Sequence, residues 1–123
     1  MATRRKLQLA EPYVIRASYA AIVAGAIQGS VEIYVGASIV EMLPAFTYLF
    51  VGFIVRAGFD KGMDGRQFVI GQALLTLLFV GQGGVALTEF LQSSPGMERL
   101  IILPVPVAAI GAYWSIRAIE KGR

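Results

Sequence analysis

Residues 67–88 read QFVIGQALLTLLFVGQGGVALT and contain no formally charged residue. A helix over this stretch would be about 33 Å long, enough to cross the roughly 30 Å hydrocarbon core of a bilayer. The whole chain has 123 residues, of which 56% are hydrophobic and only 15% charged, whereas about 25% is usual in soluble domains. Because a soluble domain of this size keeps much of its surface in water, the composition predicts an all-α integral membrane protein.

Three further apolar segments predict three further spans. Residues 100–116 form a second long uncharged run, in which Pro104 and Pro106 fall in the first turns of the expected helix. Residues 17–31 are also uncharged, with Pro12 well placed for a first turn and residues 35–38 for a tight reversal. We therefore predict a single domain, residues 1–123, with spans at about 12–34, 38–57, 67–91 and 100–118. Short connections predict an antiparallel four-helix bundle.

The basic residues predict how this bundle is oriented. Ten of the eleven lie in three short segments near the start, the middle and the end of the chain. Only Arg99 falls between the third and fourth spans. Because lysine and arginine in short loops stay on the cytoplasmic side, the pattern predicts that both termini and the loop at residues 56–66 are cytoplasmic.

Residue types that support much enzyme chemistry are missing. The chain has neither cysteine nor histidine, so disulfides, thiol nucleophiles, thiolate metal sites and imidazole ligation of a metal or haem are excluded. The basic residues are not interleaved with aromatic residues on one face, as a nucleic-acid binder would require. We expect no enzyme activity, no cofactor and no nucleic-acid partner.

Small residues recur every fourth position along the first predicted helix. Ridges of this kind let another helix approach closely in a bilayer. A similar small surface is predicted on the last helix. The helix-packing residues are Ala17, Ala21, Gly25, Gly29, Gly111 and Ser115. The ridges serve either packing inside the bundle or contact with a second copy or another membrane subunit, and both uses remain open.

Four carboxylates are predicted towards the outer side of the membrane. Glu41 and Glu98 are expected at the interface, and Glu32 and Glu89 about one turn inside it. Solvation at the interface explains all four. The alternative is a proton or cation site at Glu32 and Glu89, because a partly buried acid in a membrane is expensive and often functional. Gln72, one turn from Thr76 in the third span, is the polar residue that we add to this alternative site.

Two functions are compatible with these features. We expect a non-catalytic structural or accessory subunit that forms oligomers within a larger membrane-embedded assembly. The alternative is a minimal oligomeric transporter or channel for a small solute, coupled to protons or cations. Expected partners are the lipid bilayer and either further copies or other membrane subunits. The expected location is the plasma or inner membrane, with the membrane or shell of a virion as the alternative.

Overall fold

The computed structural model describes residues 4–62 and 64–122. Arg123 and the side chains of Arg4 and Glu98, which enter the sequence predictions above, lie outside this described part. Within it, the chain is helical and contains no strand. The elements in chain order are α1 (Arg4–Tyr34), the short 3₁₀ helix η1 (Val40–Met42), α2 (Leu43–Asp60), α3 (Gly65–Gln92), the 3₁₀ helix η2 (Met97–Ile102) and α4 (Pro104–Gly122).

Each of the four α-helices is part of a segment that is long and apolar enough to cross a membrane. These segments are 30, 21, 28 and 24 residues long; the second includes η1 and the fourth includes η2 from Arg99 onward. A helix of about 20 apolar residues matches the thickness of the hydrocarbon core. The described chain therefore has the helices of a multi-pass membrane protein, in agreement with the number of spans that the sequence predicts.

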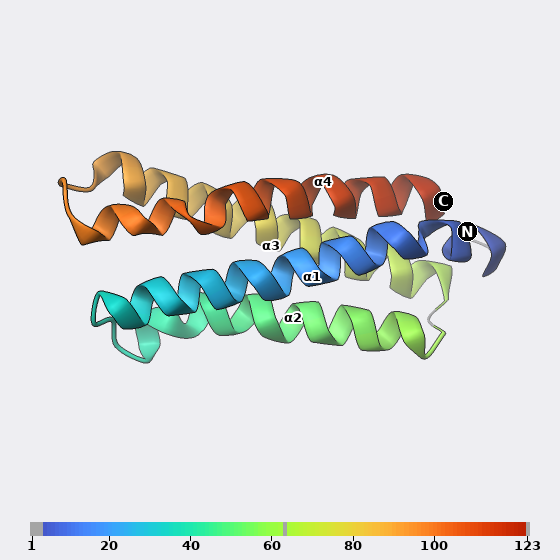
Figure 1. The fold of residues 1–123 in the computed structure, drawn as a ribbon. Helices are drawn as coiled ribbons and strands as arrows, with labels where there is room; N and C mark the ends of the chain where they lie inside the picture. Colours follow the sequence, from blue (N-terminus) through green and yellow to red (C-terminus); the bar gives the residue numbers. More distant parts are fainter. Residues whose placement is uncertain (1–3, 63, 123) are drawn as a thin grey trace.

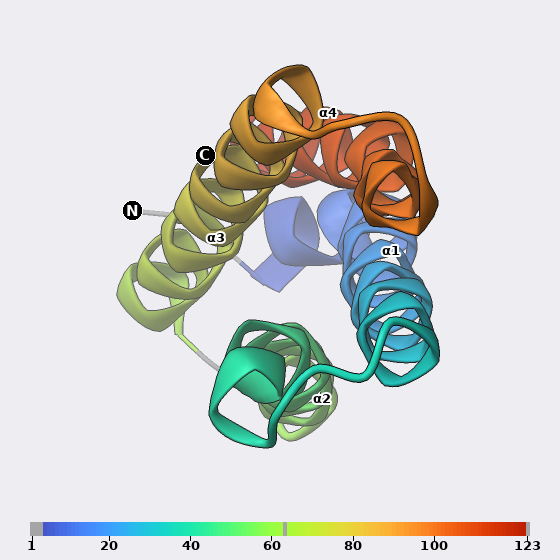
Figure 2. The ribbon, with the colours of Figure 1, turned by 90° about the vertical axis from the view of Figure 1, so that its left-hand side faces the viewer.

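The four helices pack lengthwise around a common centre (Figures 1 and 2). Both ends of the chain and the α2–α3 connection lie at one end of the bundle, which we call the terminal end (Figure 1). The α1–α2 loop and η2 lie at the opposite end, which we call the loop end. Helix α1 packs mainly against α4 and α2, whereas α3 packs mainly against α4 and touches α2 little. The weakest seam of the bundle is therefore the one between α2 and α3.

In the core, small residues of one helix pack against large aromatic rings of another. Ala17, Ala21 and Ala24 of α1 are fully buried and cluster with aromatic and aliphatic side chains of the other helices. The Phe79 ring of α3 occupies the space beside Gly111 of α4, where a β-carbon would overlap it. Because close-packed interiors lose contacts when shapes do not match, this complementarity fixes how the helices are seated.

The helix ends differ from the predicted span limits at several points. Helix α1 begins at Arg4, so Pro12 lies inside the helix and not in its first turn. Proline normally weakens a helix interior, but Ala10 and Val14 on either side are fully buried against Phe68 and Ala118. Tertiary packing therefore keeps this segment helical.

The second and fourth helices begin later than predicted. The α-helical part of α2 begins at Leu43 and not at Ser38, with Pro44 in its first turn and η1 before it. Helix α4 begins at Pro104, preceded by η2. Proline lacks the amide hydrogen that an interior position needs and tolerates the first turn. The two prolines therefore mark where regular α-helix begins.

Helix α3 matches its predicted limits closely. It runs from Gly65 to Gln92 and is capped by Asp64. The Asp64 carboxylate accepts a hydrogen bond of 2.8 Å from the backbone N–H of Gln67, whose side-chain oxygen accepts one of 3.2 Å from the backbone N–H of Asp64. This reciprocal arrangement satisfies two amide groups that a helix start leaves free.

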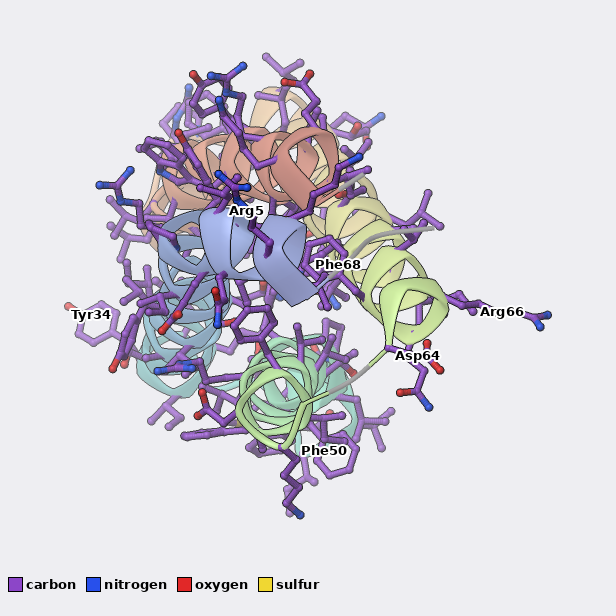
Figure 3. All side chains as sticks on the ribbon, turned by 90° about the vertical axis from the view of Figure 1, so that its right-hand side faces the viewer. Arg5, Tyr34, Phe50, Asp64, Arg66 and Phe68 are labelled. Carbon is purple, nitrogen blue, oxygen red and sulfur yellow. The ribbon has the colours of Figure 1, made fainter. Side chains whose placement is uncertain are left out.

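Most large side chains on the outside of the bundle are apolar. In the most apolar stretches of the second, third and fourth spans only 22% of the residues are buried, against 50% in the first. Phe50 and Leu77 are 67% and 68% exposed, and Figure 3 shows Phe50 pointing away from the bundle. A water-facing surface rarely exposes so many large apolar side chains.

Candidate functional site

Three carboxylates line one cavity system at the loop end of the bundle. Two adjoining cavities, of about 490 and 420 Å³, share the side chains of Glu32, Glu41 and Glu89 and that of Ile101. Glu32 lies near the end of α1, Glu41 in η1, and Glu89 near the end of α3. The fold thus brings together acids that are far apart in the sequence. We call this the acidic cavity.

Local geometry gives the three carboxylates different partners. The Gln28 amide nitrogen donates a hydrogen bond of 3.2 Å to one Glu32 oxygen, and the other oxygen is buried with no partner in the described part of the chain. The Glu41 carboxylate accepts hydrogen bonds from the backbone N–H and the hydroxyl of Ser38, at 3.3 and 3.0 Å. The side chain of Glu89 is exposed. Glu41 therefore closes its own turn, while Glu32 and Glu89 remain available to a ligand.

The cavity is electrostatically negative. Among the described residues, none of its three carboxylates forms an ion pair with a base. The nearest basic residue in the sequence, Arg99, lies over the ring of Phe90, 4.4 Å from its centre. A cleft lined by one sign of charge concentrates ions of the opposite sign. Within the described part of the chain, no group of three acids is placed to hold a metal ion.

Gln72 lies outside this cavity. Its side chain is completely buried about two turns from the start of α3, and neither amide atom has a partner in the described part of the chain. The Thr76 hydroxyl donates to the backbone oxygen of Gln72 at 2.9 Å and not to its side chain. The structure therefore brings Glu32 and Glu89 together but separates them from Gln72, because Gln72 lies 17 residues before Glu89 on α3, roughly 25 Å along the helix axis.

Several buried or cavity-lining polar groups are not assigned to a polar site by the sequence alone. Gln28 and Gln82 line the second of the two cavities, and the hydroxyls of Ser18 and Ser115 are buried without partners in the described part of the chain. The four-residue spacing of Gln28 and Glu32 is a signal that could have identified their hydrogen bond, since such pairs meet on one helix face. No sequence signal identifies the burial of Ser18.

The small-residue ridge on α1 lies against helices of the same chain. Ala17 and Ala21 are fully buried, and a β-carbon at Gly25 would come within 2.8 Å of the Ala45 backbone oxygen of α2. A β-carbon at Gly29 would lie 3.7 Å from the β-carbon of Ala45. These positions allow α1 and α2 to approach closely.

The second predicted ridge, on α4, is also turned inward. Gly111 faces Phe79 of α3, and Ser115 is completely buried. In this structure both ridges are therefore occupied inside the bundle.

Comparison with protein-family models, with curated proteins and with solved structures finds no match to the chain.

Proposed function

We propose that the four helices insert into a membrane as an antiparallel bundle with both termini on the cytoplasmic side. The apolar exterior of α2, α3 and α4 supports insertion, because it would be costly to expose to water. The position in the sequence of ten of the eleven basic residues, near the two ends of the chain and the α2–α3 connection, supports the orientation. Arg66, for example, points away from the bundle near the start of α3 (Figure 3).

Within that membrane we propose that the chain is a non-catalytic structural or accessory subunit of a larger assembly. The observation that carries this proposal is the distribution of burial among the helices. Helix α1 is half buried within the chain, whereas its three neighbours present most of their apolar residues outward. Side chains such as Phe53 and Leu77, 60% and 68% exposed, are available for van der Waals contact with other helices, which is what stabilises association in lipid.

The composition of the particle that contains the chain tests this proposal. Tagged protein would be extracted with a mild detergent and its mass and constituents determined by native mass spectrometry. We expect a particle of fixed stoichiometry that contains other membrane subunits, or recovery of the chain in purified virions. A chain that is always recovered as a monomer under the mildest extraction would contradict the proposal, and a particle made only of copies of this chain would favour the second function below.

The acidic cavity supports a second candidate function, an oligomeric transporter or channel coupled to protons or cations. Glu32 and Glu89 come from different helices and line one cavity, and an ionisable residue in a membrane segment commonly marks an ion pathway. Beyond Gln28 and Gln82 the core consists mainly of apolar side chains such as Leu75 and Phe79. The buried polar side chains of Ser18, Gln72 and Ser115 line neither cavity. For this reason we place transport second.

Glutamine substitutions distinguish the two functions. Glu32→Gln and Glu89→Gln keep the shape of the side chain but remove its charge and titration. Glu120→Gln is the matched control, because Glu120 is exposed at the terminal end, where it pairs with Arg117 at 2.9 Å. For a subunit, all three variants should assemble like the wild type. A proton- or cation-dependent flux in reconstituted vesicles, present in Glu120→Gln and absent in Glu89→Gln, would reverse our order of the two functions.

A further inference from the structure

An apolar groove follows the seam between α2 and α3 in the half of the bundle nearest the terminal end. Its volume is about 600 Å³. Its walls are Phe50, Val51, Ile54 and Val55 of α2 and Ile70 and Leu74 of α3. Inside the bundle the two helices meet through aromatic rings, with the centres of Phe59 and Phe68 6.2 Å apart. The seam is therefore closed on its inner side and hollow on its outer side.

The groove opens away from the bundle. Phe50, Ile54 and Leu74 on its walls are 67%, 53% and 57% exposed. Figure 3 shows that the Phe50 side chain points outward from α2. In the membrane orientation proposed above, the groove would face the hydrocarbon of the bilayer directly.

One end of the groove is polar and positively charged. Lys61, Gly62 and Gln67 line it where α2 ends and α3 begins. Arg56, one turn and a little more before Lys61, has its charge engaged by Asp60. The ammonium group of Lys61, by contrast, forms no ion pair with any described residue, and its side chain is exposed. A free cation thus lies at the mouth of an otherwise apolar groove.

The length of the groove corresponds to one leaflet. From Phe50 to Lys61 along α2 the rise is roughly 16 Å, about half of the ~30 Å hydrocarbon thickness. An apolar channel one leaflet long with a cation at the level of the headgroups has the polarity of a phospholipid. We propose that the groove binds one phospholipid with an anionic headgroup, its acyl chain between α2 and α3 and its phosphate at Lys61. This proposal rests on the membrane insertion proposed above.

A helix of a second copy fits the groove less well. A packed helix is about 10 Å wide and would need a seam along much of the bundle, but this groove ends midway, at Phe50 and Leu74. An apolar helix would also leave the charge of Lys61 without a partner, whereas a phosphate neutralises it. Both observations favour the lipid.

Two pairs of variants separate the apolar and the charged parts of the groove. A β-carbon at Gly71 would meet only Val55, at 3.9 Å, so Gly71→Leu should fill the groove without disturbing the helices. Gly84→Leu is its control, because Gly84 is exposed on the same helix with nothing within 4 Å of its β-carbon position. Lys61→Gln removes the positive charge at the mouth of the groove. Lys121→Gln is its control, because it removes an exposed positive charge of α4 at the same end of the bundle.

Native mass spectrometry of the detergent-solubilised protein would measure binding. Membranes would first be washed with carbonate, and the purified protein then titrated with phosphatidylglycerol or phosphatidylcholine of identical chains. We expect the wild type to bind one phosphatidylglycerol in preference to phosphatidylcholine. Gly71→Leu should reduce the affinity for both lipids about tenfold, and Lys61→Gln should reduce that for phosphatidylglycerol about fivefold. Both controls should bind like the wild type.

Other results would contradict either the lipid-binding proposal or the membrane insertion on which it rests. Equal binding by the wild type, Gly71→Leu and Lys61→Gln would overturn the proposal, as would a wild-type dimer that Gly71→Leu dissociates, since the groove would then hold a second copy. If Gly71→Leu does not fold, the comparison of Lys61→Gln with Lys121→Gln decides. Protein released by the carbonate wash would refute membrane insertion itself, whereas membrane-bound protein without the lipid preference would refute only the groove.

Discussion

A side chain at position 25 would have to displace helix α2. The β-carbon of any residue there would lie 2.8 Å from the Ala45 backbone oxygen and 2.9 Å from the Tyr48 β-carbon, and backbone atoms cannot rotate away. We expect Gly25→Leu to lower the free energy of unfolding by about 3 kcal/mol. Ala26→Leu is the control, because Ala26 is exposed. Thermal melting in detergent, followed by circular dichroism, measures both variants, and equal melting temperatures would show that this close contact is not made.

At Gln72, by contrast, a substitution is expected to stabilise the protein. Its amide is fully buried and without a partner in the described part of the chain, and an unsatisfied buried polar group costs about 1–3 kcal/mol. Gln72→Met keeps a similar length without the amide, so we expect it to raise the melting temperature. Gln92→Met, at an exposed position, should leave it unchanged. A large loss of stability in Gln72→Met would mean that a bound water or ligand normally satisfies the amide, which would strengthen the case for transport.

At the level of the helix, the start of α3 depends on the reciprocal hydrogen bonds between Asp64 and Gln67. Removing a cap of this type costs about 1 kcal/mol. We expect Asp64→Ala to lower stability by that amount, and Asp64→Asn, which keeps an accepting oxygen, to lower it much less. Amide hydrogen exchange of the first turn of α3 would show the difference, with faster exchange in Asp64→Ala. Unchanged exchange in Asp64→Ala would indicate that packing of Phe68 alone holds the turn.

The helices also show which features a sequence can predict. Local signals sufficed for α3, because its uncharged run is visible in the chain, although the capping role of Asp64 was not predicted. They failed for the start of α1, where Pro12 suggests a first turn but the burial of Ala10 and Val14 extends the helix. At the candidate site, Glu32 and Glu89 could be placed near the same membrane face from the ends of their helices. The separation of Gln72 from Glu89 could also be predicted, because 17 residues of one helix span roughly 25 Å. The burial of the Gln72 side chain depends on which face of α3 turns inward, and only packing decides that.

At the scale of the whole molecule, the orientation in the membrane can be tested directly. The chain has no cysteine, so single cysteines at Lys61 and Ser94 give unambiguous signals. Position 61 lies between α2 and α3 and position 94 between α3 and η2, at opposite ends of the bundle. We expect an impermeant thiol reagent, applied to intact cells, to label position 94 and not position 61. Labelling of position 61 with protection of position 94 would reverse the orientation.

The opposite ends of the bundle differ in charge, and this has an electrical consequence. By sequence, the terminal end carries ten basic and four acidic residues, and the loop end one basic residue, Arg99, and four acidic ones. The charges therefore form a dipole along the bundle axis, which would lie along the membrane normal in the proposed orientation. An inside-negative membrane potential favours each positive charge on its inner side by about 2.3 kcal/mol per 100 mV. In an energised cell the voltage itself would hold the molecule upright, and dissipating it before insertion would raise the share of inverted copies.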